Sequence, residues 1–325
     1  MERRDSISLV VREHEAGTRL DRFIADRLQL SRQKVNSLEG GIRLNGRPCK
    51  KGRFIEKDDV VQIDTSRLPG DWKPAAHSPE LLKVIKELDD IVFVEKPAGI
   101  HCHPLLQDDV PTLLSAVLCK YPEVGLVGRD PREGGLVHRL DKDTSGVVVF
   151  ARNNHAYEVL RQAFKHGKIS KEYIALVRGR VFGRGEITLD IGHHPSNPGK
   201  MVALKNGREK TRGRIMPAVT RYTHLAVLGG YTLVSIAIKT GRMHQIRLHM
   251  AAIGHPVAGD ATYGYAEQDV KVMPLLNRHF LHAALIGIPD TIIANGVRVR
   301  SNLPRELAVT ARKLVRTSNS GITPR

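Results

Sequence analysis

The chain has 325 residues, 41% of them hydrophobic, enough for one large domain or a medium domain with a small one. It has no run approaching the roughly 18 apolar residues of a membrane-spanning helix, and no apolar segment follows its charged N-terminus, so neither a membrane protein nor a secretory signal is predicted. Three widely spaced cysteines favour a reducing cytoplasm over a disulfide framework. Fifty-one Lys and Arg against 34 Asp and Glu give a net charge of +17, which indicates a polyanionic partner.

A small N-terminal unit is predicted for residues 1–65. Four apolar residues at helical spacing predict its first helix: Leu20, Phe23, Ile24 and Leu28. Ser31 is placed to cap a second helix. A strand at 42–44, the turn Asn45-Gly46 and a strand at 60–63 complete the unit. It ends at a linker, residues 66–80, where three prolines and a glycine interrupt regular structure.

Basic residues dominate the middle of this unit. Glu39 is the only acid between positions 31 and 53, and the same stretch holds seven cations: Arg32, Lys34, Arg43, Arg47, Lys50, Lys51 and Arg53. Two helices followed by turn-linked strands with this basic edge resemble the small αL RNA-binding module first found in a ribosomal protein. The resemblance implies that Arg32, Lys34, Arg43 and Lys50 contact RNA phosphates, which gives affinity with little sequence readout. A solvated charged face is the alternative interpretation.

A second domain is predicted for residues 81–325. Apolar runs predict strands at 91–94, 147–150, 173–177 and 231–238. One helix is expected after Asn153 or Asn154, and another carries Met243, Ile246, Met250 and Ile253 on one face. Because regular helices do not separate the strands, we expect an α+β fold with a largely antiparallel sheet.

The most informative segment is the polar loop from His138 to Gly146, which precedes the apolar strand at 147–150. Residue types alone leave three interpretations of this loop open. It is a structural turn, or Asp141 and Asp143 form a metal site as in nucleotide-sugar transferases, or one aspartate is a nucleophile beside basic residues that orient a phosphodiester substrate.

The same segment, written HRLDKDTSG, resembles the signature HRLDxxTSG of the RluA-type pseudouridine synthases at every specified position. Further family elements follow the same order along the chain: KPAG at 96–99 with His103-Pro104, KEY at 171–173, TGRMHQIR at 240–247, GHPVAGDATYG at 254–264 and LHA at 281–283. Two departures are Glu95, where the family commonly has asparagine, and Met243, where it usually has threonine. We expect a packing change at Met243 without loss of chemistry.

The resemblance implies an isomerase that converts uridine in RNA to pseudouridine. Breaking the N1–C1′ bond and rejoining the base through C5 is redox-neutral, so we expect no cofactor. Asp141 is then the nucleophile or takes part in proton removal from the sugar. The resemblance assigns Arg242 as the guanidinium that keeps Asp141 ionised. It assigns Tyr173 to stacking on the uracil and to acting as base or relay at the C5 proton.

The target base has to leave its stack to reach an enclosed carboxylate. Arg139, beside Asp141, is expected to enter the vacated space, with a phosphate contact as the alternative. Lys171 is expected to support the pocket or to contact phosphate, and His138 to shape the loop. The histidine pairs at 101/103 and 193–194 lack further ligands at usable spacing, so no metal site is expected.

The expected partner is RNA, with ribosomal large-subunit RNA favoured over transfer RNA because of the N-terminal module. The alternatives are a catalytically silent RNA-binding protein acting in ribosome assembly and a metal-dependent glycosyl transferase. Retention of Asp141, Tyr173 and Arg242 counts against the first. A monomer is expected, since the sequence has no sustained heptad pattern.

Overall fold

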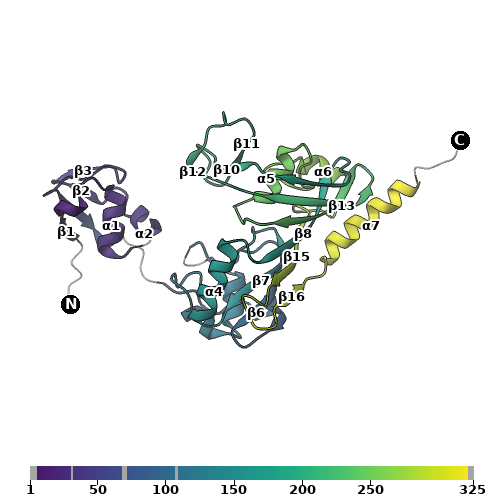
Figure 1. Cartoon of the computed structure of the whole chain (residues 1–325), viewed down its shortest axis with the longest axis horizontal. Helices are drawn as coiled ribbons and strands as arrows, with labels where there is room; N and C mark the ends of the chain where they lie inside the picture. The colour runs from purple at the N-terminus through teal and green to yellow at the C-terminus, as the bar shows by residue number, and fades with distance from the viewer. Residues whose placement is uncertain (1–5, 31, 68–71, 107–108, 321–325) are drawn as a thin grey trace. The chain divides into compact units, whose positions relative to one another are not determined.

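A computed structural model describes residues 6–30, 32–67, 72–106 and 109–320. The chain divides into two compact units, residues 1–72 and 73–325 (Figure 1). The division falls inside the segment 66–80, which the sequence predicts as a linker. Each unit has its own hydrophobic core, as a separately folding domain requires.

The first unit is a four-stranded antiparallel sheet with two helices. The strand order is β1-β4-β2-β3. Its elements are β1 (Ser6–Val10), α1 (Leu20–Leu28), α2 (Arg32–Ser37), β2 (Ile42–Leu44), β3 (Arg47–Pro48) and β4 (Val60–Asp64). The two predicted helices and the strands at 42–44 and 60–63 agree with this arrangement. The edge strand β1 was not predicted from the sequence.

Local sequence explains the limits of these elements. Leu20, Phe23 and Ile24 of α1 are buried, because the 3.6-residue period places them on one face. Asn45 and Gly46 both have positive φ, 51° and 76°, as a two-residue hairpin turn between β2 and β3 requires. Ser31, the expected cap of α2, lies outside the described residues.

The second unit contains a nine-stranded sheet, which confirms the predicted α+β fold. The strand order is β5-β6-β7-β15-β8-β14-β13-β9, and β16 pairs with β15. All of these pairs are antiparallel except β7 with β15. The strands are β5 (Lys83–Glu87), β6 (Ile91–Lys96), β7 (Ser145–Ala151), β8 (Ser170–Arg178), β9 (Arg184–Ile187), β13 (Thr220–Leu228), β14 (Tyr231–Ile238), β15 (Leu281–Ile288) and β16 (Val297–Arg300).

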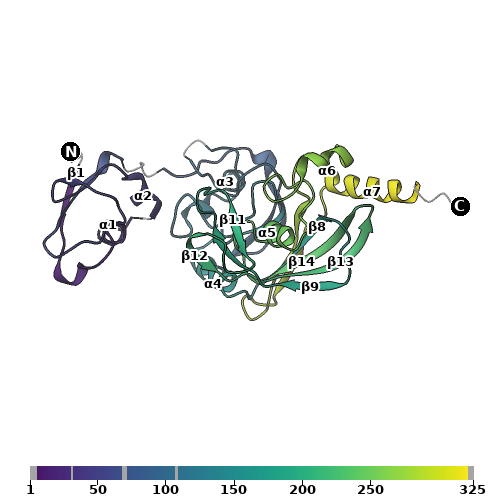
Figure 2. The same ribbon diagram turned by 90° about the horizontal axis from the view of Figure 1, so that it is seen from above.

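A separate three-stranded sheet, with the order β11-β10-β12, lies against helix α5 (Figure 2). It comprises β10 (Asp190–His193), β11 (Met201–Leu204) and β12 (Arg212–Met216). The helices of the second unit are α3 (Leu113–Leu118), α4 (Asn154–Lys165), α5 (Gln245–Ala252), α6 (Ala266–Val272) and α7 (Arg305–Ser320). Of the two caps expected for this helix, Asn153 is the one used: its side chain caps α4 by accepting the N–H of Ala156 at 2.9 Å.

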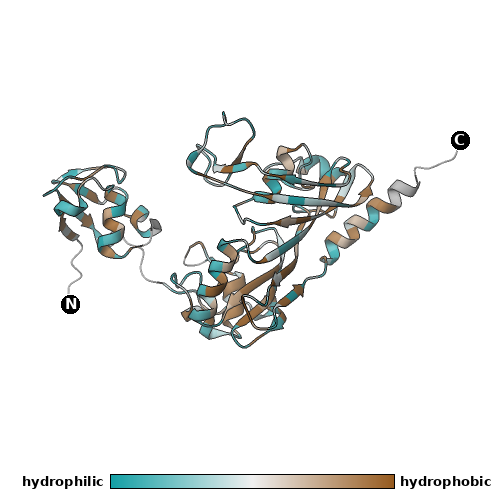
Figure 3. Cartoon of the chain, in the orientation of Figure 1, coloured by the Kyte–Doolittle hydropathy of each residue, from teal (hydrophilic) through white to brown (hydrophobic). Residues whose placement is uncertain are grey.

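The core lies on both faces of the nine-stranded sheet. Strand β7 is buried along its whole length, with Val148 and Phe150 in one cluster and Val147 and Val149 in the other. Helix α3 covers the first face and α4 the second. The apolar colouring of the central strands in Figure 3 reflects this burial on two faces. Within the described residues, no helix is both long and apolar enough to cross a membrane.

Candidate active site

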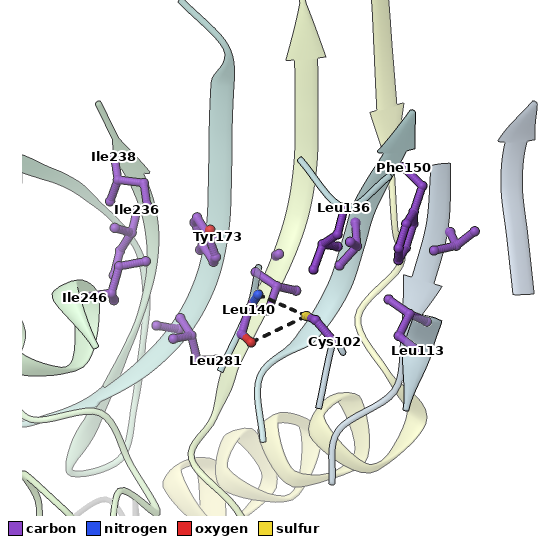
Figure 4. Close-up of a cluster of buried hydrophobic side chains, with 14 of the residues drawn as sticks. Cys102, Leu113, Leu136, Leu140, Phe150, Tyr173, Ile236, Ile238, Ile246 and Leu281 are labelled. Atoms are coloured by element: carbon purple, nitrogen blue, oxygen red, sulfur yellow. Dashed lines mark hydrogen bonds between the residues drawn. The ribbon is translucent and has the colours of Figure 1, made fainter. Parts of the chain in front are cut away.

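The loop 138–144 leads into β7, and its apolar residue anchors it to the core. The Leu140 N–H donates to Cys102 Sγ at 3.3 Å, and the Cys102 thiol donates back to the Leu140 carbonyl at 3.6 Å (Figure 4). Both residues belong to the buried cluster that also contains Tyr173. This anchor fixes the backbone immediately before Asp141.

Lys96, at the end of β6, binds backbone carbonyl groups of the same loop. Its ammonium group is fully buried and donates to the carbonyls of Lys142 at 2.6 Å, Thr144 at 3.0 Å and Pro97 at 2.9 Å. All three donors of the group are thereby used. Burial lowers the pKa of Lys96 to about 8. The KPAG element thus contributes a buried cation that holds the backbone of the loop.

Two residues just before β15, Arg278 and His279, also hold the loop. Arg278 donates to the Asp143 carbonyl at 2.9 Å and to Ser145 Oγ at 3.0 Å, and it pairs with Glu306 of α7 at 2.9 Å. His279 Nε2 lies 2.8 Å from Thr144 Oγ1, and burial lowers the pKa of this histidine to about 4. His279 is therefore a neutral structural partner at physiological pH.

Gly146, the last residue of the loop motif, permits β7 to approach β15. Its φ is +126°, and a Cβ built on it would lie 2.2 Å from the carbonyl oxygen of Ala283. No larger residue fits without moving backbone. The glycine of the motif is therefore required by strand packing.

Asp141, in the middle of this fixed loop, forms an ion pair with Arg247. Arg247 Nη1 lies 3.0 Å from Asp141 Oδ2. The other edge of the guanidinium binds both oxygens of Asp260, Nε to Oδ2 at 2.7 Å and Nη2 to Oδ1 at 2.9 Å. The Asp260 side chain is fully buried and that of Arg247 is 8% exposed, whereas that of Asp141 is 25% exposed. Asp260 therefore fixes the Arg247 guanidinium by two hydrogen bonds, and Nη1 of the same guanidinium binds the accessible carboxylate of Asp141.

The opposite charges of Arg247 and Asp260 stabilise the ionised form of each group. Burial alone would lower the pKa of Arg247, but the hydrogen bonds and charges of Asp260 and Asp141 outweigh it and raise that pKa. Burial alone would raise the pKa of Asp260, and the Arg247 guanidinium lowers it below its ordinary value. Both groups of the buried pair stay ionised at neutral pH.

The expectation that Arg242 pairs with Asp141 is corrected by this geometry. The Arg242 side chain donates to the Pro217 carbonyl at 3.2 Å, and its backbone N–H donates to Gln245 Oε1 at 3.0 Å. Among the described residues, the guanidinium that donates to Asp141 is that of Arg247. The sequence carried a usable signal: an arginine inside the apolar helix of the HQIR element needs an acid partner, and the GHPxxGD element supplies Asp260.

Tyr173 lies on β8 within the main core cluster, with its side chain largely buried. It lines the same small cavity as Asp141. Burial raises the pKa of Tyr173, and the charge of Asp141 raises it further. The phenol is therefore neutral in the free protein, which suits stacking on a base or relaying a proton but disfavours a standing phenolate base.

His244 is a neighbour of Asp141 that the sequence analysis did not select. It adopts a left-handed backbone conformation, φ 57°, at the start of α5. Its Nδ1 lies 2.9 Å from the Tyr263 hydroxyl, and its Nε2 lies 4.0 Å from Asp141 Oδ2. Burial lowers the pKa of His244, opposed by the charge of Asp141. Met243 beside it packs in the apolar cluster between α5 and the three-stranded sheet.

Two adjoining cavities open at this site. The smaller, of about 120 Å³, contains Asp141, Tyr173 and Arg247 in its wall. The larger, of about 560 Å³, extends along α4. Arg139, Tyr173, Ile238, Gly241 and Arg242 line both, so they form the ridge between the two cavities.

The remaining predicted residues of this unit lie around the larger cavity. Arg139 is exposed on the ridge, and Lys171 is buried in the cavity wall. His138 stacks on Phe164, with ring centroids 4.5 Å apart, and its Nε2 accepts the Val149 N–H at 3.1 Å. Burial lowers the pKa of His138 to about 3, so a neutral ring supports the loop.

The predicted RNA-binding residues of the first unit lie on α2, on β2 and just after β3. Arg43 and Lys50 are exposed, and Lys34 is half-buried. The side chain of Arg32 lies outside the described part of the structure. Arg43 donates to the Gly46 carbonyl at 3.2 Å, beside the hairpin turn.

Within the described residues, no group of three or more His, Cys, Asp or Glu is arranged to hold a metal ion. Asp141 of the Asp-Lys-Asp sequence is engaged by Arg247, and the nine-stranded sheet is mostly antiparallel. Both observations count against the interpretation as a metal-dependent sugar transferase.

Comparison with known proteins identifies the family of the chain. The family model described as RNA pseudouridylate synthase matches residues 90–252. An uncharacterized RNA pseudouridine synthase of Mycobacterium tuberculosis is 34% identical over 92% of this chain and 95% of its own length. Ribosomal large subunit pseudouridine synthase D of Nitrosomonas europaea is 30% identical over 99% of this chain and 92% of its own. The solved structure of human RNA pseudouridylate synthase domain containing 1 superposes with a TM-score of 0.57 at 26% identity, covering 77% of this chain and 99% of that one.

The chain therefore belongs to the RNA pseudouridylate synthase family, in its RluA-type branch. It is an isomerase that converts uridine in RNA to pseudouridine.

Proposed function

We propose that this enzyme modifies uridines of large-subunit ribosomal RNA, with Asp141 as its catalytic carboxylate and no cofactor. The observation that carries the catalytic assignment is the Asp141–Arg247–Asp260 arrangement beside Tyr173 in the small cavity. A carboxylate that is partly exposed and paired on one side has a free oxygen for the ribose. The ribosomal substrate is supported by relatives named ribosomal large subunit pseudouridine synthase D.

The proposed chemistry needs only groups of this chain and water. Asp141 acts on the ribose, by attack on C1′ or by removal of a sugar proton, and the electrons of the N1–C1′ bond pass to the base. The base turns and rejoins C1′ through C5; on the first route this bond displaces the Asp141 carboxylate from C1′, and on the second the carboxylic acid returns the proton to the sugar. C5 then loses its proton and N1 gains one, so the reaction is balanced without redox change. Tyr173 stacks on the uracil, and its neutral hydroxyl relays the C5 proton.

RNA binding is proposed for two sets of residues. Arg139, exposed on the ridge beside Asp141, enters the space that the extruded uridine leaves in its helix. The first unit acts as an αL-type module in which Arg32, Lys34, Arg43 and Lys50 contact phosphates. The net charge of +17 supports a phosphate-dominated contribution to affinity. The enzyme acts as a monomer.

Pseudouridine mapping of total RNA tests this function. Cells with the gene deleted are compared after rescue with wild type, Asp141→Asn or an exposed control, Lys168→Met. We expect discrete sites in large-subunit RNA to disappear on deletion and to return with wild type and the control but not with Asp141→Asn. Sites in transfer RNA would redirect the substrate assignment. Restoration by Asp141→Asn would remove the catalytic assignment.

A further inference from the structure

Among the described residues of the second unit, one buried cation, Lys171, has no hydrogen-bond or ion-pair partner within the protein and lines the larger cavity. Within the described residues, four lysines or arginines are buried: Lys96, Lys171, Arg247 and Arg278. Lys96 has three carbonyl acceptors, Arg247 has two carboxylates, and Arg278 has carbonyls and Glu306. Lys171 is 7% exposed. Among the described residues, no carboxylate lies within ion-pair distance of its ammonium group.

The surroundings of Lys171 are an aromatic ring, which attracts the ammonium weakly, and the cation Arg242, which repels it. The Lys171 Nζ lies 5.9 Å from the centre of the Phe164 ring, and a Cβ built on Gly241 would lie 3.6 Å from it. The ammonium therefore sits against the TGR turn, one residue from Arg242. Burial and, to a smaller extent, the charge of Arg242 together lower the pKa of Lys171 to about 8. Two cations held together without an anion are stabilised when an anion binds.

The cavity beside Lys171 is strongly basic. Six cationic side chains line it: Arg129, Arg139, Arg161, Lys165, Lys171 and Arg242. Two acids also line it, and one of them, Glu158, is already paired with Arg129 at 3.0 Å. The neutral ring of His138 is a further titratable group close to Lys171, and Glu133, His103, Tyr157 and Tyr173 line the same cavity. The volume of the cavity, about 560 Å³, is in the range of ligand pockets.

We propose that Lys171 and Arg242 form a phosphate-binding subsite, which holds the phosphodiester adjoining the uridine that occupies the small cavity. This rests on the proposed RNA substrate. The two cavities share the ridge of Arg139, Tyr173 and Arg242, so a strand whose uridine enters the smaller cavity continues over this ridge into the larger one. The phosphate supplies the negative charge that the protein lacks at Lys171.

The first test uses inorganic phosphate and the wild-type protein. Lysine side chains labelled at the ε-carbon are titrated by NMR in chloride and in phosphate at equal ionic strength, with the Lys171 signal assigned by its loss in Lys171→Arg. We expect the pKa of Lys171 to rise in phosphate, and the rise to be smaller in Arg242→Met. Lys168→Met, at an exposed position, should leave the shift unchanged. An identical pKa in both anions would overturn the subsite.

The second test locates the phosphate in RNA. A stem-loop carrying the mapped uridine is prepared with a neutral methylphosphonate at one position at a time. Wild type should lose about tenfold in affinity at one phosphate next to the target. Lys171→Met should bind the unmodified RNA about tenfold more weakly than wild type does. Replacing that one phosphate with methylphosphonate should then cause no further loss of affinity in Lys171→Met. Additive losses at every position would contradict the proposal.

The outcomes separate the subsite from the proposed function. A phosphate-dependent pKa without pseudouridine in large-subunit RNA would retain the subsite and remove the substrate assignment. Pseudouridine formation with neither a pKa change nor coupling to a phosphate would retain the function and remove the subsite.

Discussion

Arg247 joins the accessible carboxylate of Asp141 to the buried carboxylate of Asp260. Its Nη1 contacts Asp141 Oδ2 at 3.0 Å, while Nε and Nη2 occupy both oxygens of Asp260. Because Asp260 is fully buried, the guanidinium is fixed before any substrate binds. A preorganised cation costs no reorganisation during the reaction, and this is the arrangement that electrostatic catalysis needs.

Replacing Arg247 should affect both stability and turnover. Arg247→Met leaves Asp260 buried without its partner, so we expect the free energy of unfolding to fall by about 3–5 kcal/mol. We expect kcat to fall by about 100-fold or more, since Asp141 loses its oriented donor. Denaturant unfolding and single-turnover assays measure the two effects. Arg247→Met combined with Asp260→Leu should recover much of the stability but not kcat. Unchanged stability in the single variant would mean that the buried pair is not formed.

Replacing Arg242 should have a different signature. Its side chain does not contact Asp141 and lies on the ridge between the cavities. Arg242→Met should therefore raise KM and reduce the salt dependence of RNA binding by about one phosphate contact, with a smaller effect on kcat. Binding at several salt concentrations and steady-state kinetics provide the comparison. A loss confined to kcat would instead assign Arg242 to the chemical step.

The neutral form of Tyr173 leads to a prediction about binding. Burial and the charge of Asp141 raise its pKa, so stacking does not depend on ionisation. Tyr173→Phe should keep RNA affinity within about twofold, whereas Tyr173→Ala should lose about 1–3 kcal/mol of binding free energy. Binding is measured by fluorescence anisotropy. Equal losses in the two variants would show that the hydroxyl, not the ring, binds the RNA.

Lys96 gives a pH-dependent contribution to stability. Its pKa is lowered from 10.5 to about 8 by burial, so between these values the unfolded chain binds a proton that the folded chain does not. The stability contribution of this group therefore rises with pH through that window and is smallest below pH 8. The stability of wild type relative to Lys96→Met should rise by about 3 kcal/mol across it. Chemical denaturation at a series of pH values gives this difference, and a flat difference would contradict the burial of a charged Lys96.

Lys96 should also position the catalytic loop. Without its ammonium, the carbonyls of Lys142 and Thr144 lose a shared donor next to Asp141. Lys96→Met is therefore expected to lower kcat with little change in KM. Lys120→Met, at an exposed lysine whose side chain reaches Glu87, is a suitable control.

Gly146→Ala tests the close approach of β7 and β15. The added methyl group would meet the Ala283 carbonyl oxygen at 2.2 Å, at a backbone φ of +126°. We expect a loss of at least about 2 kcal/mol in the free energy of unfolding, from strain and displacement of the strand. Gly183→Ala also has positive φ but meets nothing within 4 Å, so it controls for backbone strain alone. Similar losses in both variants would show that contact with β15 is unimportant.

Sequence by itself determined the class of fold and the family motif that contains the proposed catalytic carboxylate. The α+β arrangement followed from strands without regular intervening helices, and α4 begins at the predicted Asn153 cap. Local periodicity and caps act within a few residues, so they can be identified before the fold is known. The edge strand β1 was missed because five residues of alternating pattern are stabilised mainly by their partner β4.

Only the tertiary structure decided which arginine meets Asp141. Arg242 and Arg247 lie in one motif, and the pairing with Asp141 spans 106 positions of sequence. That choice depends on where the first turn of α5 meets the loop before β7, and on Asp260 engaging the other edge of the guanidinium. The isolation of Lys171 is likewise invisible in sequence, because a missing partner is a property of the packed environment and not of the residue.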